Sequence, residues 1–264
     1  MLSSQQVEQF ITNGYIRLER AFPGELADQG REILWRDMGC SQFDSTTWTR
    51  PVVWLGRYHD PPFVSAANTP ALQSAYNQLI GPGQWLPMRG LGTFPIRFPG
   101  NSDTGDTGWH VDASFAGPDS TADDFLSWRV NVNSKGRALL ALFLFSDIGE
   151  VDAPTRIRVG SHTVVAKLLE PLGDAGAAVR SLNLASTASC GEVVATGEAG
   201  TVYLCHPFLV HAAQTNRGHG PRFMAQPPLF SKKELNVQQE AERPIFPMEE
   251  AIRRALRRRR NNCI

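Results

Sequence analysis

The pattern of apolar and polar positions changes character about a third of the way along the chain. In the first part, apolar residues recur at the spacing of amphipathic helices. The pattern predicts a helix capped by Ser3 or Ser4 and ending at Asn13-Gly14, a helix from about Pro23 to Met38, and a helix from Pro70 to Ile80. Residues 15–18 are predicted to form a short strand between the first two helices.

From about residue 90 the chain becomes a series of short apolar runs separated by Gly, Pro, Asn and Asp. This pattern is typical of the many short strands of a sandwich or barrel. The predicted strands cover residues 92–98, 109–115, 138–145, 155–159, 192–196, 201–204, 210–214 and 222–227. We therefore predict a mainly β fold, a double-stranded β-helix (a jelly-roll, cupin-like core) with flanking N-terminal α-helices and a short C-terminal helix.

The length and the continuity of this pattern favour one domain over residues 1–264. A helical part covers about 1–88, the jelly-roll core about 89–230 and a C-terminal extension 231–264. The last residues carry acidic side chains followed by arginines at helical spacing, which complements a helix dipole. We interpret this tail as a solvated C-terminal helix in preference to a nucleic-acid or membrane patch.

Composition narrows the function classes and the compartment. The 26 basic and 26 acidic residues balance, which argues against a general nucleic-acid partner or an acidic membrane surface. The start of the chain lacks the pattern of a signal peptide, and the longest apolar run, Ala138 to Phe145, is too short to cross a bilayer. Four scattered cysteines suit reduced thiols. We expect a cytoplasmic monomer or homodimer that takes a small-molecule substrate.

The candidate chemistry lies in Trp109-His110-Val111-Asp112 and in His211, about a hundred residues later. Alternate residues of a strand face the same side, so His110 and Asp112 are predicted to point together. With a distant histidine from another strand they form a two-histidine, one-carboxylate set, which binds Fe(II) on one face and leaves open positions opposite. Arg222 adds a rigid cationic fork suited to a carboxylate.

The third ligand has a rival in His206, which precedes Arg217 by the same offset that joins His211 to Arg222. Arg217 lies in a Gly-rich turn, where a side chain tends to face water. Arg222 opens an alternating segment that aims it at one face of a strand. We therefore favour His211 as the ligand and interpret His206 as an outer-sphere or turn residue.

Ordered motifs over most of the chain resemble the phytanoyl-CoA dioxygenase (PhyH-like) family of Fe(II)/2-oxoglutarate oxygenases. The resemblance is carried by the following segments: Phe10 to Ile16, 109–112, 160–162, 206–211, Asn216 and Pro221-Arg222. It implies that His110, Asp112 and His211 bind iron and that Arg222 holds the distal carboxylate of 2-oxoglutarate. It also implies that Asn216 is a turn former.

Two further positions follow from this resemblance. Some members place a hydroxyl residue near the co-substrate where this chain has Ala213, so Thr201 and Thr155 are the candidates for that contact. Halogenating relatives lack the carboxylate ligand because chloride takes its position, so Asp112 favours oxygen-atom chemistry.

The leading hypothesis is a dioxygenase that uses Fe(II), O2 and 2-oxoglutarate and oxidises, by hydroxylation, a small metabolite while releasing succinate. Candidate substrate contacts are Arg97, which interrupts an apolar strand, together with Phe115 and Trp54. A buried ion pair is the alternative role for Arg97, and a core position is the alternative for the tryptophans. Two other functions stay open: a metal-dependent dioxygenase or isomerase that does not use 2-oxoglutarate, on a cupin-like barrel, and a non-catalytic ligand-binding barrel.

Overall fold

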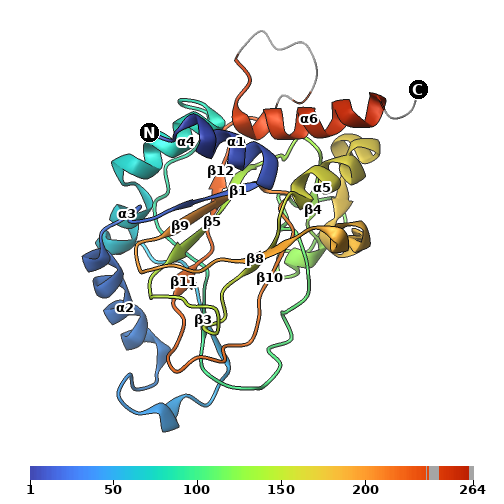
Figure 1. Cartoon of the computed structure of the whole chain (residues 1–264). Coiled ribbons are helices and arrows are strands. Elements are labelled where there is room, and N and C mark those ends of the chain that lie inside the picture. Colours follow the sequence, from blue (N-terminus) through green and yellow to red (C-terminus); the bar gives the residue numbers. More distant parts are fainter. Residues whose placement is uncertain (236, 238–243, 262–264) are drawn as a thin grey trace.

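The computed structural model describes residues 1–235, 237 and 244–261, without the side chains of 258–261 (Figure 1). Within these residues no helix is both long and apolar enough to span a bilayer. The α-helices are α1 (Ser4–Asn13), α2 (Gly24–Met38), α3 (Pro61–Ala67), α4 (Pro70–Ile80), α5 (Ser161–Leu169) and α6 (Pro247–Asn261). Short 3-10 helices are η1 (Ser45–Thr47), η2 (Phe125–Ser127), η3 (Glu170–Ala175), η4 (Val179–Ser181) and η5 (Ala185–Ser189).

The strands form two sheets that face each other and two smaller pairs. The larger sheet has the order β1 (Tyr15–Leu18), β9 (Val202–Cys205), β5 (Arg137–Leu144) and β11 (Met224–Ala225), and β12 (Pro228–Phe230) also pairs with β5. The smaller sheet has the order β10 (His211–Ala212), β6 (Arg156–Arg158) and β8 (Glu192–Val194). Two further pairs join β2 (Val52–Leu55) to β3 (Phe94–Arg97) and β4 (Arg129–Val130) to β7 (Ala177–Ala178).

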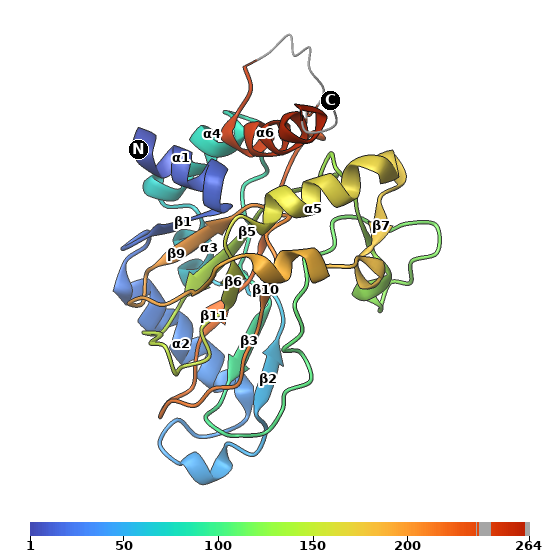
Figure 2. The same cartoon turned by 45° about the vertical axis from the view of Figure 1, so that its right-hand side comes forward.

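All of these strand pairings are antiparallel. Neighbouring strands such as β1 and β9 come from opposite ends of the chain, which is how a jelly roll brings distant segments together (Figures 1 and 2). The predicted fold class, a jelly-roll core with flanking helices, is confirmed. The N-terminal part also contributes strands, because β1, at the predicted residues 15–18, completes the larger sheet and β2 pairs with β3.

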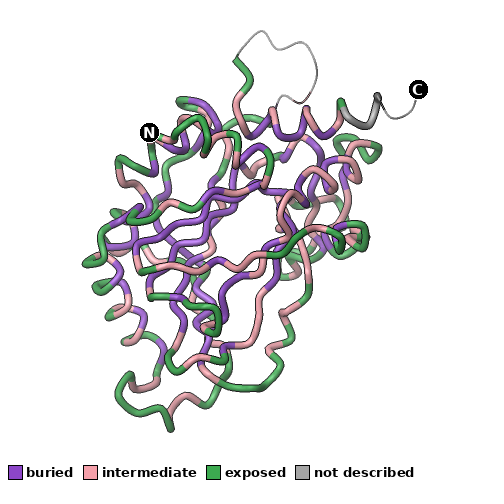
Figure 3. Tube along the Cα trace, in the orientation of Figure 1, coloured by how far each residue is buried: buried purple, intermediate pink, exposed green. Residues whose placement is uncertain are grey.

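The core lies between the sheets and under the helices. Strand β5 is buried along almost its whole length, as expected for an apolar run without alternation (Figure 3). Helices α2 and α3 pack on each other beside the larger sheet. Gly30 of α2 allows this packing because a Cβ there would lie 2.7 Å from the Phe145 ring, next to β5, and 3.1 Å from the Phe63 ring of α3. Helix α4 begins at the predicted place, where the Thr69 side chain accepts a hydrogen bond from the Leu72 amide.

Helix α6 confirms the predicted C-terminal helix but corrects its expected environment. It packs against α1, α4 and α5 instead of being solvated all round, and Met248, Ile252 and Ala255 are buried in the core. On its outer side Arg254 forms ion pairs with Glu8 of α1 and Glu250. The apolar face therefore anchors the helix, and the arginines at 258–260 have side chains outside the described part.

A second correction concerns residues 109–115, which the alternation predicted as a strand. The segment is extended but makes only two isolated bridges, from His110 to His211 and from Phe115 to Arg129. It therefore crosses the open end of the barrel as a connecting segment. Two other predicted strands, 92–98 and 155–159, are present as β3 and β6 inside the expected ranges.

Two buried histidines lie between α1, α5 and the end of β9. The rings of His162 and His206 are 5.0 Å apart, and His162 Nε2 contacts the Ile11 carbonyl oxygen at 3.0 Å. Gly14 permits this packing, since its φ of +83° is left-handed and a Cβ would lie 2.5 Å from His162 Nδ1. Burial lowers the pKa of His162 to about 4. Burial and the neighbouring His162 lower the pKa of His206 well below its usual range.

This pair predicts acid sensitivity of the fold. The two histidines stay neutral in the folded protein but bind protons in the unfolded chain. Their contribution to the free energy of unfolding is therefore complete above pH 6.5 and is lost as the pH falls toward about 4. For His162 the loss of free energy of unfolding is on the order of 3 kcal/mol. We expect urea unfolding at pH 7 and pH 4.5 to show a smaller difference for His162→Gln than for the unsubstituted chain. An equal difference in both would contradict the prediction.

Candidate metal centre

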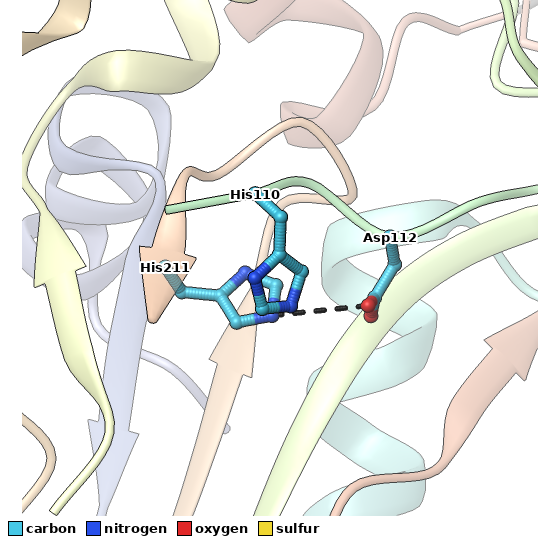
Figure 4. Close-up of side chains that lie close together, drawn as sticks. All are labelled: His110, Asp112 and His211. Atoms are coloured by element: carbon cyan, nitrogen blue, oxygen red, sulfur yellow. Dashed lines mark ion pairs between the residues drawn. The ribbon is translucent and has the colours of Figure 1, made fainter. Parts of the chain in front are cut away.

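Three side chains meet at one end of the barrel as the sequence predicts. The ligand atoms of His110, Asp112 and His211 all lie within 4.8 Å of one another, and His211 Nε2 is 3.8 Å from Asp112 Oδ1 (Figure 4). The bridge between His110 and His211 fixes the relative position of the two segments, with both backbone amide–carbonyl bonds at 3.0 Å. Two imidazoles and a carboxylate in this arrangement can hold an iron ion.

Both histidine rings are oriented by backbone carbonyls of their own segments. His110 Nδ1 is 2.9 Å from the Gly108 oxygen, and His211 Nδ1 is 3.0 Å from the Leu209 oxygen. Because Nδ1–H donates to these oxygens, each Nε2 keeps its lone pair for a metal. Burial, together with the neighbouring His110, lowers the pKa of His211 to about 4, so this ring is neutral at physiological pH.

Arg137 holds the carboxylate of the triad. Its Nη1 donates a hydrogen bond of 2.7 Å to Asp112 Oδ2. Burial alone would favour the neutral acid, but the charge and the hydrogen bond of Arg137 outweigh it and keep the pKa of Asp112 below its usual range. Asp112 is therefore a carboxylate ready to bind a cation.

The rival histidine is excluded from the triad by its position. His206 is fully buried beside His162 and Phe208, and its Nδ1 accepts a hydrogen bond from the Phe208 amide. Arg217 is exposed, as its turn predicted. In the ranges that the structure describes, His110, Asp112 and His211 are the one group of three with metal-binding geometry.

A cavity of about 480 Å3 opens beside the triad. Its inner wall contains both histidines and its outer wall is largely apolar. The lining residues are Trp54, Arg97, Gly105, Asp106, Gly108, Trp109, His110, Leu126, Thr155, Val179, Arg180, Leu182, Leu184, His211, Ala213 and Gln226.

Two buried arginines lie side by side, of which Arg97 lines the cavity and Arg222 is not among the lining residues. Arg97 and Arg222 are bridge partners, only 2% and 1% exposed. Arg97 bonds to Asp106 and Thr104, whereas Arg222 donates to the carbonyl oxygens of Ala153 and Pro95, at 2.8 and 2.9 Å. Burial and the charge of Arg97 lower the pKa of Arg222 to about 9, so it remains cationic. The region thus favours a further anion.

The remaining predicted residues are divided between the cavity and its surroundings. Thr155, Arg97 and Trp54 line the cavity, and Arg97 also makes the ion pair that was its alternative role. Thr201 is buried against Gly197 and Phe115 bridges to Arg129, both outside the lining.

Asn216 is a turn former as expected, and Trp48 is a core residue. Trp48 packs in the core against Trp35 and Phe98. Asn216 shapes its turn, accepting from the Gly218 amide and donating to the Gly220 and Arg97 carbonyls.

Several residues of the site were not predicted. Arg137 is a cation at the start of a buried apolar strand, a signal that could have marked it. Trp109 lines the cavity with Arg156 and Arg158 over its ring, at 4.7 and 4.1 Å from the centroid. Both arginines lie on one face of β6 because alternate residues of a strand face the same side, and this can be predicted from the sequence. Their contact with Trp109 depends on the tertiary structure.

A jelly-roll barrel with a His-x-Asp pair and a distal histidine at its open end defines the class of non-haem iron oxygenases. Residues 49–224 match the family described as phytanoyl-CoA dioxygenase (PhyH). The chain belongs to this family, whose members are Fe(II)/2-oxoglutarate-dependent oxygenases, and the predicted family and class of enzyme are confirmed.

Solved structures of this fold are similar over most of the chain. The epimerase SnoN, in complex with Fe3+, alpha ketoglutarate and nogalamycin RO, is 15% identical with a TM-score of 0.55, covering 86% of this chain and 82% of its own. EctD from S. alaskensis, with 2-oxoglutarate and 5-hydroxyectoine, is 21% identical with a TM-score of 0.57, covering 87% and 76%. HygX from Streptomyces hygroscopicus, with nickel and 2-oxoglutarate, is 18% identical with a TM-score of 0.54, covering 88% and 87%. No curated protein sequence matched the chain.

Proposed function

We propose that this protein is an Fe(II)- and 2-oxoglutarate-dependent dioxygenase that hydroxylates a small-molecule metabolite. The overall reaction combines a substrate C–H bond, O2 and 2-oxoglutarate and yields the hydroxylated substrate, succinate and CO2. The single observation that carries this proposal is the convergence of His110, Asp112 and His211 with both Nε2 atoms free. Bound iron supplies the activation of O2 that is coupled to decarboxylation of the co-substrate.

The residues of the site bind the metal, exclude water and keep the ligand atoms available. His110, Asp112 and His211 would hold the iron, and His110 and His211 line the cavity from which 2-oxoglutarate and O2 would reach it. The apolar outer wall excludes water from the reacting centre. The depressed pKa of His211 keeps its ring neutral and its Nε2 available at physiological pH.

The co-substrate's distal carboxylate is assigned to Arg222. The support is electrostatic: two buried guanidinium groups, Arg97 and Arg222, have one nearby carboxylate, that of Asp106. A further carboxylate balances this charge. Thr155 lines the same cavity and is the better placed of the two candidate hydroxyl contacts, and Thr201 stays a prediction from the resemblance.

The cavity favours a small substrate with an apolar part. Leu126, Val179, Leu182 and Leu184 form the outer wall, and Trp54, which is 58% exposed, lies at the rim. Arg97 and Trp54 are the substrate contacts that we retain. A cytoplasmic monomer or homodimer without nucleic-acid or membrane partners remains the proposed setting.

Anaerobic titration with Fe(II) and 2-oxoglutarate tests the proposal. We expect the weak visible charge-transfer band of the iron–co-substrate chelate, and succinate formation when O2 is admitted. Metal binding without this band would favour the metal-dependent dioxygenase or isomerase. A band without O2 consumption for any substrate in a metabolite panel would favour the non-catalytic barrel.

A further inference from the structure

We propose that Arg137 is a positioning residue of the metal centre: it holds one oxygen of Asp112, so that only the other carboxylate oxygen would join the two histidines in binding iron. The inference rests on the proposed function, because it concerns the same metal. In this role Arg137 controls how the Asp112 carboxylate binds iron and how strongly it donates electrons to the metal.

The two carboxylate oxygens of Asp112 have separate partners. Oδ1 faces the histidines, 3.8 Å from His211 Nε2 (Figure 4). Oδ2 accepts the 2.7 Å hydrogen bond from Arg137 Nη1. A free carboxylate can bind a metal through one oxygen or through both. With Oδ2 held by a charge-assisted hydrogen bond, Asp112 binds through Oδ1 alone, which preserves the open positions that the co-substrate and O2 need.

The backbone around Arg137 holds it in place for this contact. Arg137 is the first residue of β5 and follows Gly136, whose φ of +82° turns the chain into the strand. Its amide donates to the Ser134 carbonyl, and its carbonyl accepts from Ser134 Oγ at 2.7 Å. The side chain is 13% exposed, so little conformational freedom is left to lose when it binds Asp112.

The charge of Arg137 has a second consequence. Asp112 and Arg137 together are formally neutral, so the centre keeps the full positive charge of Fe(II) toward the cavity. A guanidinium bonded to the carboxylate withdraws electron density from it and makes it a weaker donor. Both effects favour binding of the dianionic co-substrate to iron, because opposite charges attract strongly at a site shielded from water.

Three variants of Arg137 separate positioning from a merely structural role. Arg137→Met removes the donor and the charge, Arg137→Gln keeps a donor without the charge, and Arg137→Lys keeps the charge. Arg129→Met is the matched control, because Arg129 is also partly buried but donates to the carbonyls of Ala175 and Gly176 instead of Asp112. Each protein is titrated anaerobically with Fe(II) and 2-oxoglutarate, and its thermal midpoint is measured.

In Arg137→Met we expect the charge-transfer band at longer wavelength, because a stronger carboxylate donor raises the energy of the iron electrons. We also expect 2-oxoglutarate binding weakened on the order of ten-fold, the lower end of the effect of removing an outer partner. Arg137→Lys should restore the band toward its original position, and Arg129→Met should not move it. If Arg137→Met does not fold, Arg137→Gln tests the loss of the charge alone, and we expect its band to move in the same direction by a smaller amount.

An unmoved band in folded Arg137→Met or Arg137→Gln would overturn the inference while leaving the proposed function intact. A band that moves equally in Arg129→Met would also overturn it, since the effect would then be a general one. If the unsubstituted protein forms no band at all, the proposed function fails, and the role of Arg137 fails with it.

Discussion

His211→Ala is expected to abolish the iron–2-oxoglutarate band and to lower succinate formation at least about 100-fold. Loss of an outer partner alone already costs about 10–100-fold, and His211 is itself a ligand. The structure places its Nε2 3.8 Å from Asp112 Oδ1, so its removal leaves two of the three donors. The measurement is anaerobic titration of the purified variant, followed by single-turnover succinate assay.

The rival histidine provides the control for this prediction. His206→Gln removes an imidazole that lies beside His162 and Phe208, away from the triad. We expect this variant to keep the band and to unfold at a lower temperature, because a buried packed ring is lost. If His206→Gln lost the band and folded His211→Ala kept it, the assignment of the third ligand would be wrong.

Arg222→Met is expected to weaken 2-oxoglutarate binding by about 100-fold or more while Fe(II) binding persists. Two hydrogen bonds from a guanidinium to a carboxylate contribute roughly 1.5–3 kcal/mol each. The methionine side chain fills part of the space, which limits the destabilisation from an emptied site. The dissociation constant of 2-oxoglutarate in the presence of saturating Fe(II) is the quantity to measure.

Arg217→Met is the matched control, because it removes an exposed arginine that lies at the same offset from His206. We expect its 2-oxoglutarate affinity to be unchanged. Equal affinity in folded Arg222→Met and the unsubstituted protein would show that Arg222 does not hold the distal carboxylate. Arg97, its buried neighbour at the cavity wall, would then be the next arginine to replace.

Local signals predicted the helices well where caps and periodicity agree. Helix α4 begins after Thr69 and ends before Gly81, and α1 begins after Ser3 in a capping box and ends before Gly14. Such ends depend on a few neighbouring residues, so they are encoded locally. Helix α5 was missed because Gly160 precedes it without a side-chain cap and the preceding residues belong to a strand.

Strands were predicted less completely because their partners are distant in sequence. Residues 109–115 alternate like a strand yet find only two isolated bridges. Strand β2 went unpredicted, since its stability depends on pairing with β3 some forty residues later. Alternation records which side chains face inward, but the neighbouring chain decides whether a sheet forms.

The sequence by itself determined the family and the jelly-roll class, and it gave His110, Asp112 and one of two distal histidines as the candidate metal ligands. Residue type and order suffice for this, because a His-x-Asp pair, a distal histidine and a following arginine are what the chemistry of such an iron site requires. Only the tertiary structure decided between His211 and His206, by bringing one beside Asp112 and burying the other against His162. It also set Arg137 against Asp112. These contacts join residues far apart in the chain, and their geometry depends on how two sheets close over one another, which no local pattern encodes.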